Sequence, residues 1–214
     1  MHGLWAQFLK VAAAHMLAVA SPGPDFAMVV RQSLAHGRRA AVWTSVGIGT
    51  AILLHITYTA LGIGLLLRGS PVAFSVVKFS GAAYLAWIGF KALSSRPAPV
   101  PNPEPGGEAA VQGQPTPRAA WSAGFLTNAL NPKVTLFMVA LYASLIDPAT
   151  PRLVQAAYGI WMSLATMAWF AVVSVLITRA SVRRAFLRAG VWIDRVMGLL
   201  FIGLAVALAV ATAS

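Results

Sequence analysis

Two proline-containing stretches of the chain each combine an ionisable side chain with residues that interrupt helices. The first consists of Ser21, Pro22, Gly23, Pro24 and Asp25, and the second of Asn131, Pro132 and Lys133, with Asn128 one turn earlier. A proline removes a helix hydrogen bond, and the residue before it is pushed away from helical geometry. Both stretches therefore predict a helix break with free backbone groups next to a charged side chain.

One acidic and one basic group at two facing breaks match an amino-acid zwitterion. Asp25 could bind the ammonium group, while Lys133 or the N-terminus of a half-helix could bind the carboxylate. We also hypothesise that Asp25, in a partly dry cavity, exchanges a proton for the transported solute. The alternative is structural: both motifs are proline kinks, and Lys133 reaches the membrane surface or bonds Asp25 for packing alone.

Other candidates carry weaker signals. His15 and His55 could relay protons or bind metal, but isolated histidines without a carboxylate cluster are more typical of hydrogen-bonded core residues. Asp194 precedes Arg195 at the expected beginning of the last span, where a boundary anchor or local ion pair is the simpler interpretation. His55 and Asp194 are secondary candidates. The sequence shows no nucleophile–base pair, phosphate-binding loop or metal-spaced cluster, so we expect no enzyme activity, cofactor or bound metal.

Composition indicates the environment in which these residues act. Of 214 residues, 58% are hydrophobic and 10% are charged, whereas a soluble domain carries about 25% charged residues. The chain has no cysteine, which excludes disulfides, thiolate metal sites and thiol redox chemistry. A polytopic membrane protein is predicted, and the N-terminal segment is expected to be a retained span rather than a cleaved signal.

A membrane-spanning helix needs about 20 largely apolar residues, and six stretches qualify. They are residues 4–22 with a continuation to 30, 40–67, 71–90, 119–146, 153–178 and 191–213. These runs are too long and continuous for barrel strands of about ten alternating residues. We predict an all-α bundle of six transmembrane helices. Glycines expected to let these helices approach closely are Gly47, Gly49, Gly62, Gly64, Gly81 and Gly89.

Basic residues exceed acidic ones by 16 to 5, for a formal net charge of +11. Ten of them lie in alternate connections: Arg31, Arg38 and Arg39; Lys91, Arg96 and Arg118; Arg179, Arg183, Arg184 and Arg188. The positive-inside rule places these connections in the cytoplasm and both termini in the periplasm. Nucleic-acid binding is the competing interpretation, but it does not require alternation, and no nucleic-acid partner is predicted.

A proline-rich linker divides the chain into two halves. Residues 95–118 hold seven of the 13 prolines, a composition that is extended or disordered. The predicted single transporter domain therefore consists of residues 1–94, the cytoplasmic linker 95–118, and residues 119–214. Three spans per half place the halves in opposite orientations, as in inverted-repeat transporters. At an offset of 110, Pro22 falls on Pro132 and Gly49 on Gly159.

The motifs together resemble the LysE/RhtB family of amino-acid exporters. The resemblance rests on residues 21–25, Gly-Arg-Arg at 37–39, Gly47, Gly49, His55, residues 81–85 with Gly89, residues 124–128 running into 131–133, and residues 193–195 with Gly198 and Gly203. It implies a bacterial inner-membrane exporter of an amino acid or derivative, such as lysine, threonine or homoserine. The resemblance also implies a proton gradient or membrane potential as the driving force, without ATP, and a homodimer.

Other members of the wider superfamily leave an alternative open. Some relatives export the divalent metals cadmium or nickel, and others pass electrons through paired cysteines, which this chain lacks. With four unclustered histidines, divalent-metal export is the less favoured function. A membrane scaffold without transport activity is the third hypothesis.

Overall fold

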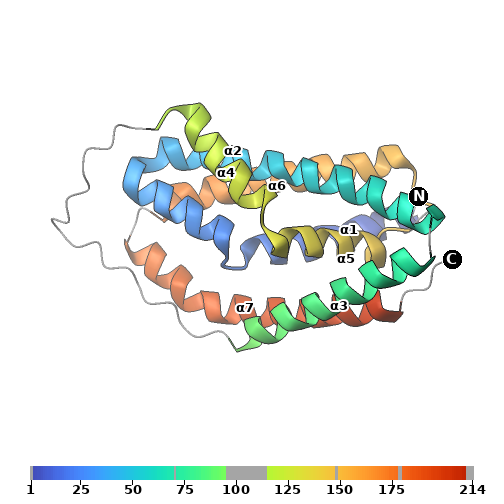
Figure 1. Ribbon diagram of the computed structural model, residues 1–214. Helices are drawn as coiled ribbons and strands as arrows, with labels where there is room; N and C mark the ends of the chain where they lie inside the picture. Colours follow the sequence, from blue (N-terminus) through green and yellow to red (C-terminus); the bar gives the residue numbers. More distant parts are fainter. Residues whose placement is uncertain (1, 70, 95–114, 148, 178–179, 211–214) are drawn as a thin grey trace.

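The computed structural model describes residues 2–69, 71–94, 115–147, 149–177 and 180–210, which form helices and no strand. In chain order the helices are α1 (His2–Ala20), α2 (Pro24–Gly69), α3 (Pro71–Leu93), α4 (Pro117–Ala129), α5 (Pro132–Leu145), α6 (Arg152–Leu176) and α7 (Ala180–Val210). Over these residues the all-α prediction is confirmed. Figure 1 shows an elongated bundle in which both helix breaks, between α1 and α2 and between α4 and α5, lie part-way along its length.

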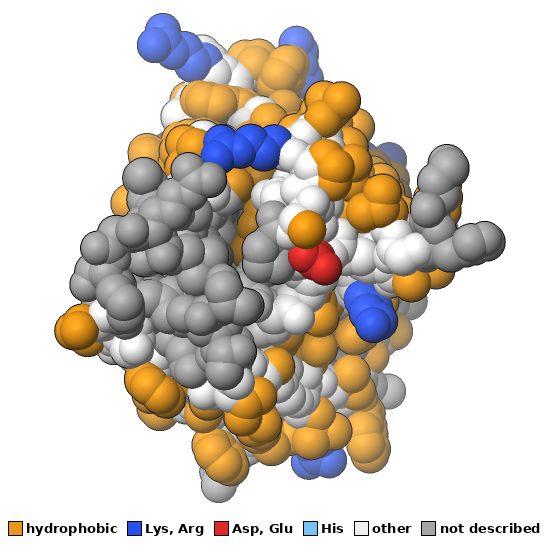
Figure 2. All heavy atoms as spheres, turned by 90° about the vertical axis from the view of Figure 1, so that its right-hand side faces the viewer, with side chains coloured by type: hydrophobic (Ala, Val, Ile, Leu, Met, Phe, Trp, Pro, Cys, Tyr) orange, Lys and Arg blue, Asp and Glu red, His pale blue; other side chains and the backbone are white. Residues whose placement is uncertain are grey.

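Several of these helices suit a lipid environment. Among the described residues, four helices contain a segment long and apolar enough to cross a membrane: Gly3–Ala20, Pro24–Leu61, Arg152–Leu176 and Ala189–Val210. Pro132–Leu145 is a shorter apolar helix. Large apolar side chains such as Ile160, Leu164 and Val206 are exposed, and Figure 2 shows such side chains around the rim of the molecule. Soluble monomers rarely expose contiguous surface of this kind. The protein is a helical membrane protein, and six spans in two inverted repeats stay a prediction.

Both breaks form where the prolines predict them. α1 ends at Ala20 and the chain resumes helix at Pro24. α4 ends at Ala129, and α5 begins with Pro132 at its first position, where a proline has no helix partner to lose. Asn131 caps α5: its side-chain Oδ1 accepts a hydrogen bond from the Lys133 backbone N–H at 3.0 Å. The cap fixes the start of α5 and with it the position of Lys133.

Two of the predicted connections are helical instead. The segment around Arg38 lies in α2, where only Gly37 departs from helical geometry, with φ 81° and ψ 178°. Glycine has no Cβ to oppose this left-handed backbone, so one residue turns the chain. α7 begins at Ala180 rather than at residue 191, because the arginine-, alanine- and leucine-rich residues before the apolar run have high helix propensity. Asp194 therefore lies inside α7, not at its beginning.

The proline-rich linker is described only at its end. Residues 95–114 of the predicted 95–118 segment lie outside the described residues. Thr116 caps α4 by accepting a hydrogen bond from the Ala119 N–H at 3.2 Å, and Pro117 and Arg118 are already helical. Helix α4 therefore includes the last two residues of the predicted linker, because threonine followed by proline is a favourable helix start.

The basic residues gather at one end of the bundle. In Figure 1 the turn within α2 and the starts of α4 and α7 lie at the same end, which carries residues 38–39, Arg118 and residues 183–184, while α3 ends part-way along the bundle. The starts of α1, α3 and α6 and the end of α7 lie at the opposite end. The alternation found along the sequence is thus an asymmetry between two ends in space.

Glycines bring three pairs of helices into backbone contact. A Cβ on Gly47 would clash with the Trp121 backbone, and one on Gly124 with the Thr44 backbone, so α2 and α4 touch. A Cβ on Gly49 would likewise clash with the backbone of Ser163 in α6. One on Gly89 of α3 would clash with the backbone of Gly198 in α7. The packing role predicted for Gly47, Gly49 and Gly89 is confirmed. Gly81 contacts the Leu208 side chain, and the surroundings of Gly62 and Gly64 lie outside the description.

We expect Gly124→Ala to lower the thermal unfolding midpoint of the purified protein, because the new methyl group has no room against the Thr44 backbone. Overpacking of this kind costs about 1–3 kcal/mol. Gly203→Ala in α7 is the matched control, since a Cβ there meets nothing within 4 Å. Thermal unfolding in detergent measures both variants, and equal midpoints would contradict the close α2–α4 packing.

Candidate functional site

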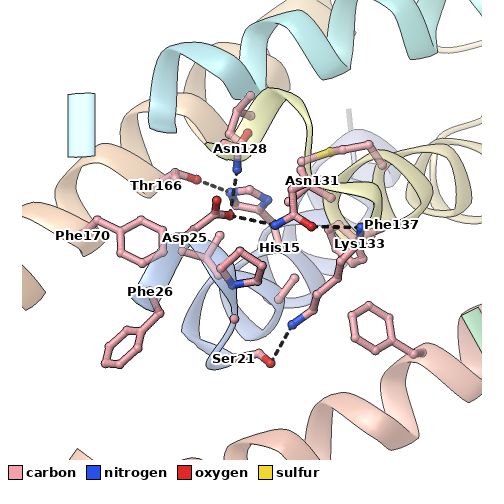
Figure 3. Close-up of a pocket in the computed structure, with 18 residues that line it drawn as sticks. His15, Ser21, Asp25, Phe26, Asn128, Asn131, Lys133, Phe137, Thr166 and Phe170 are labelled. Atoms are coloured by element: carbon pink, nitrogen blue, oxygen red, sulfur yellow. Dashed lines mark hydrogen bonds between the residues drawn. The ribbon is translucent and has the colours of Figure 1, made fainter. Parts of the chain in front are cut away.

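A cavity lies between the two helix breaks and is shown in Figure 3. Its polar wall consists of His15, Ser21, Asp25, Asn128, Asn131, Lys133 and Thr166, and the larger apolar side chains around it are Phe26, Ile52, Phe137, Met138, Phe170 and Phe201. The cavity volume is about 40 Å³. A water molecule needs roughly 10–15 Å³ of such volume, so this conformation has room for a few waters.

Asp25 is held by amide groups from the second break. Asn128 Nδ2 donates a hydrogen bond to Asp25 Oδ2 at 2.9 Å, and Asn131 Nδ2 donates to the same oxygen at 3.5 Å. Both asparagines are buried. Asp25 Oδ1 is also buried but has no hydrogen-bond partner among the residues that the structure describes. The carboxylate is thus oriented through one oxygen, while the other is left for a further donor.

Lys133 reaches from α5 to the first break. Its Nζ donates a hydrogen bond to Ser21 Oγ at 2.9 Å, and Ser21 Oγ donates onward to Asp194 Oδ1 at 3.2 Å. The ammonium group interacts electrostatically with both Asp194 and Asp25 and lies 5.5 Å from the centroid of the Phe201 ring. One cation therefore lies between two carboxylates that come from α2 and α7.

His55 supports the second break from behind the cavity. Proline at position 132 cannot donate a helix hydrogen bond to the carbonyl of Asn128, and that oxygen instead accepts from the Asn131 backbone N–H at 2.9 Å. His55 Nε2 also donates to that oxygen at 3.0 Å, and His55 Nδ1 is hydrogen-bonded to the Tyr58 hydroxyl. With both ring nitrogens paired, His55 is the hydrogen-bonded core residue that its isolation in the sequence predicts. It does not line the cavity.

His15 lines the cavity, although its sequence context favours a core histidine over a functional one. It was expected to be a core histidine, and its Nε2 does bond the Met162 carbonyl at 3.1 Å and Thr166 Oγ1 at 2.9 Å. However, it also lines the cavity and leaves Nδ1 unpaired. Its place less than two turns before the Ser21 break was the available signal.

The structure brings most of the predicted site residues to this one cavity. Lining it are Ser21, Gly23, Pro24, Asp25, Asn128, Asn131 and Lys133. Pro22 and Pro132 do not line it and act by breaking the helices. Asp194, expected at a membrane boundary, instead joins the site through Ser21. Among the described residues, no three His, Asp or Glu side chains group closely enough to hold a metal ion.

Apolar membrane helices around a charged cavity at two helix breaks are the arrangement of a membrane transport protein. Sequence comparison agrees with this class. The chain belongs to the LysE type translocator family, whose sequence model matches residues 16–212.

Named relatives of the chain are efflux proteins. It is 30% identical over 200 residues to the threonine efflux protein of Escherichia coli K12, covering 92% of this chain and 94% of the relative. It is 33% identical over 135 residues to the homoserine/homoserine lactone efflux protein of Salmonella typhimurium, covering 63% of this chain and 62% of that relative. No solved structure shows a significant match.

Proposed function

We propose that this protein exports an amino acid or a small amino-acid derivative by secondary-active transport, and that the zwitterion binds between Asp25 and Lys133. The observation that carries the proposal is that these two side chains, more than one hundred residues apart in the sequence, line one cavity at two helix breaks. The efflux relatives support an amino-acid substrate.

In the proposed complex, the ammonium group of the substrate binds Asp25, and its carboxylate binds Lys133. The carboxylate takes the place of Ser21 Oγ, the present acceptor for Lys133 Nζ. Charge-assisted hydrogen bonds of this kind are roughly twice as strong as neutral ones. The remaining wall is apolar and aromatic, which favours a substrate with a small uncharged side chain.

Binding requires the cavity to open. With about 40 Å³, the described conformation is too small for an amino acid, so the side chains at the breaks must separate. The breaks are suited to this motion because backbone hydrogen bonding is already interrupted there. We propose that the described conformation is a closed state between loading and release.

The element order supports two inverted repeats, 1–94 and 119–214. Shifting α3 by 110 residues places it on 181–203, inside α7. The same shift moves the part of α2 after Gly37 onto a range that contains α6, and the part before Gly37 onto most of α5. Each half therefore has the same order of elements: a helix, a break, a short helix, a turn and two long helices. The opposite orientation of the halves follows from the odd number of spans in each.

The proposal includes the bacterial inner membrane, with the basic end of the bundle in the cytoplasm and both termini in the periplasm. It is supported by the concentration of arginines at that end. Proton coupling through Asp25 is part of the proposal as well. The homodimer implied by the family resemblance stays a prediction.

This orientation predicts the behaviour of reporter fusions. Alkaline phosphatase fused after Ser214 is expected to be active in cells, because the enzyme folds only in the periplasm, and green fluorescent protein at the same point is expected to be dark. Fusions placed in the 95–118 segment are expected to behave in the opposite way. The reverse pattern at both positions would show that the basic end faces outward.

Counterflow in proteoliposomes tests the proposed function. Liposomes containing the purified protein and unlabelled threonine or homoserine are expected to accumulate the labelled amino acid in a saturable way, whereas protein-free liposomes are not. Labelled lysine and cadmium or nickel ions test the alternatives. Flux of metal alone would favour the metal exporter, and flux of none of these solutes would favour the scaffold; either result would contradict the proposal.

A further inference from the structure

Three polar atoms on the cavity wall have no hydrogen-bond partner within the described structure: Asp25 Oδ1, Asn128 Oδ1 and His15 Nδ1. His15 and Asn128 are each only 1% exposed, and all three residues line the cavity. Buried polar atoms in proteins are normally paired. Three unpaired atoms from α1, α2 and α4 on one cavity indicate a place for a missing partner.

The hydrogen bonds already made show that all three atoms are acceptors. A carboxylate only accepts, and the asparagines both donate to the other oxygen of Asp25. The amide nitrogen of Asn128 faces that oxygen, so its Oδ1 is the carbonyl side of the amide. His15 Nε2 lies 3.1 Å from the Met162 carbonyl oxygen, which only accepts. Nε2 therefore carries the hydrogen, and Nδ1 of the neutral ring is an acceptor.

A primary ammonium group has three N–H donors and no acceptor, which matches this set. We propose that Asp25 Oδ1, Asn128 Oδ1 and His15 Nδ1 bind the substrate's α-ammonium group, with His15 as a recognition residue. This inference rests on the proposed function and extends it. Figure 3 shows these side chains gathered on one side of the cavity, with Lys133 Nζ at Ser21 on another, so the substrate's carboxylate lies toward Lys133.

The two buried histidines illustrate the difference between a structural and a recognition role. His55 uses both ring nitrogens within the protein, one on the Asn128 carbonyl and one on the Tyr58 hydroxyl. His15 uses only Nε2, to hold α1 against α6. The second nitrogen of His15 contributes nothing to the fold, and its place on the cavity wall assigns it to the ligand.

Two substitutions at His15 separate recognition from structure. Glutamine places an amide near the position of Nε2, so His15→Gln can keep the bonds to Met162 and Thr166 but loses the acceptor at Nδ1. Asparagine places its amide oxygen near the position of Nδ1, so His15→Asn keeps that acceptor and loses the bond to Thr166. Recognition predicts the larger transport defect for His15→Gln, whereas a purely structural role predicts it for His15→Asn.

The experiment measures counterflow of labelled L-threonine and its inhibition by two unlabelled compounds, L-threonine and its N,N,N-trimethyl derivative, which keeps the charge but has no N–H. We expect His15→Gln to raise KM by roughly tenfold, as loss of one hydrogen bond to a charged group does. It is also expected to reduce the preference of the wild type for threonine over the trimethyl derivative. His36→Gln, a histidine outside the cavity that bonds Gln32, is expected to leave both values unchanged.

The outcomes are distinguishable. If the wild-type protein shows no amino-acid counterflow, the proposed function is wrong and the ammonium site with it. If the wild type exchanges threonine but His15→Gln keeps the wild-type KM and preference, or His15→Asn is the more defective variant, the ammonium site is wrong while the proposed function stands.

Discussion

Asp25→Asn is expected to reduce amino-acid export by at least roughly thirtyfold, because removing one partner of a buried charge pair costs about 2–5 kcal/mol. The substitution keeps the size of the side chain, and the new amide oxygen can still accept the hydrogen bond from Asn128 Nδ2. What it removes is the negative charge that faces the ammonium group of the substrate and the Lys133 side chain. Export rates from preloaded proteoliposomes measure the effect.

Asp147→Asn is the matched control for this variant. Asp147 follows α5, is exposed, and accepts a hydrogen bond from the Ala149 N–H at 2.7 Å. We expect it to export at the wild-type rate. The asparagine at position 25 keeps the hydrogen bond from Asn128, and Asp194 still interacts with Lys133, so the thermal unfolding midpoint of Asp25→Asn should fall less than that of Lys133→Gln. Wild-type export by a folded Asp25→Asn variant would exclude both substrate binding and proton coupling by Asp25.

Lys133→Gln is expected to have the second large effect, on both affinity and stability. The substitution removes the cation with which Asp25 and Asp194 both interact electrostatically, and carboxylates in a partly buried site are destabilising when their compensating charge is lost. We therefore expect a lower thermal unfolding midpoint. KM for the amino acid should rise at least roughly tenfold, since the charged donor for its carboxylate is lost.

A double substitution separates these two effects. In Lys133→Gln with Asp194→Asn, one of the two carboxylates is neutralised, so part of the lost stability should return while KM stays high. Lys91→Gln is the control, because Lys91 Nζ also lies near an aromatic ring, 5.1 Å from the Trp87 centroid, but outside the cavity. A KM for Lys133→Gln equal to that of the wild type would show that Lys133 has only a packing role.

The helix breaks could be predicted from the sequence because proline acts on its own backbone. Pro24 begins α2 and Pro132 begins α5, and the residues before them leave the helix whatever surrounds them. That the two breaks meet could not be derived locally. It depends on packing between helices, including the contacts at Gly47 and Gly124 that hold α2 against α4.

The hydropathy pattern predicts Asp194 at the beginning of the last span, whereas the structure places it inside α7. A stretch chosen for its apolar residues ends where arginines begin, but arginines do not interrupt the hydrogen bonding of a helix. Helix α7 therefore starts well before its apolar part. This places Asp194 inside the helix, where packing against the first break lets it accept from Ser21. His15 and His55 likewise look equivalent in the sequence. Only the tertiary structure shows which ring nitrogens are paired.

The central claim is that one cavity between the two breaks holds both charged ends of an amino acid. A structure of the protein in lipid nanodiscs with bound L-threonine or L-homoserine tests it most directly. We predict that the ligand lies between the breaks, with its ammonium nitrogen hydrogen-bonded to Asp25 Oδ1 and its carboxylate to Lys133 Nζ. A ligand bound elsewhere in the bundle, or one that touches neither side chain, would contradict the claim.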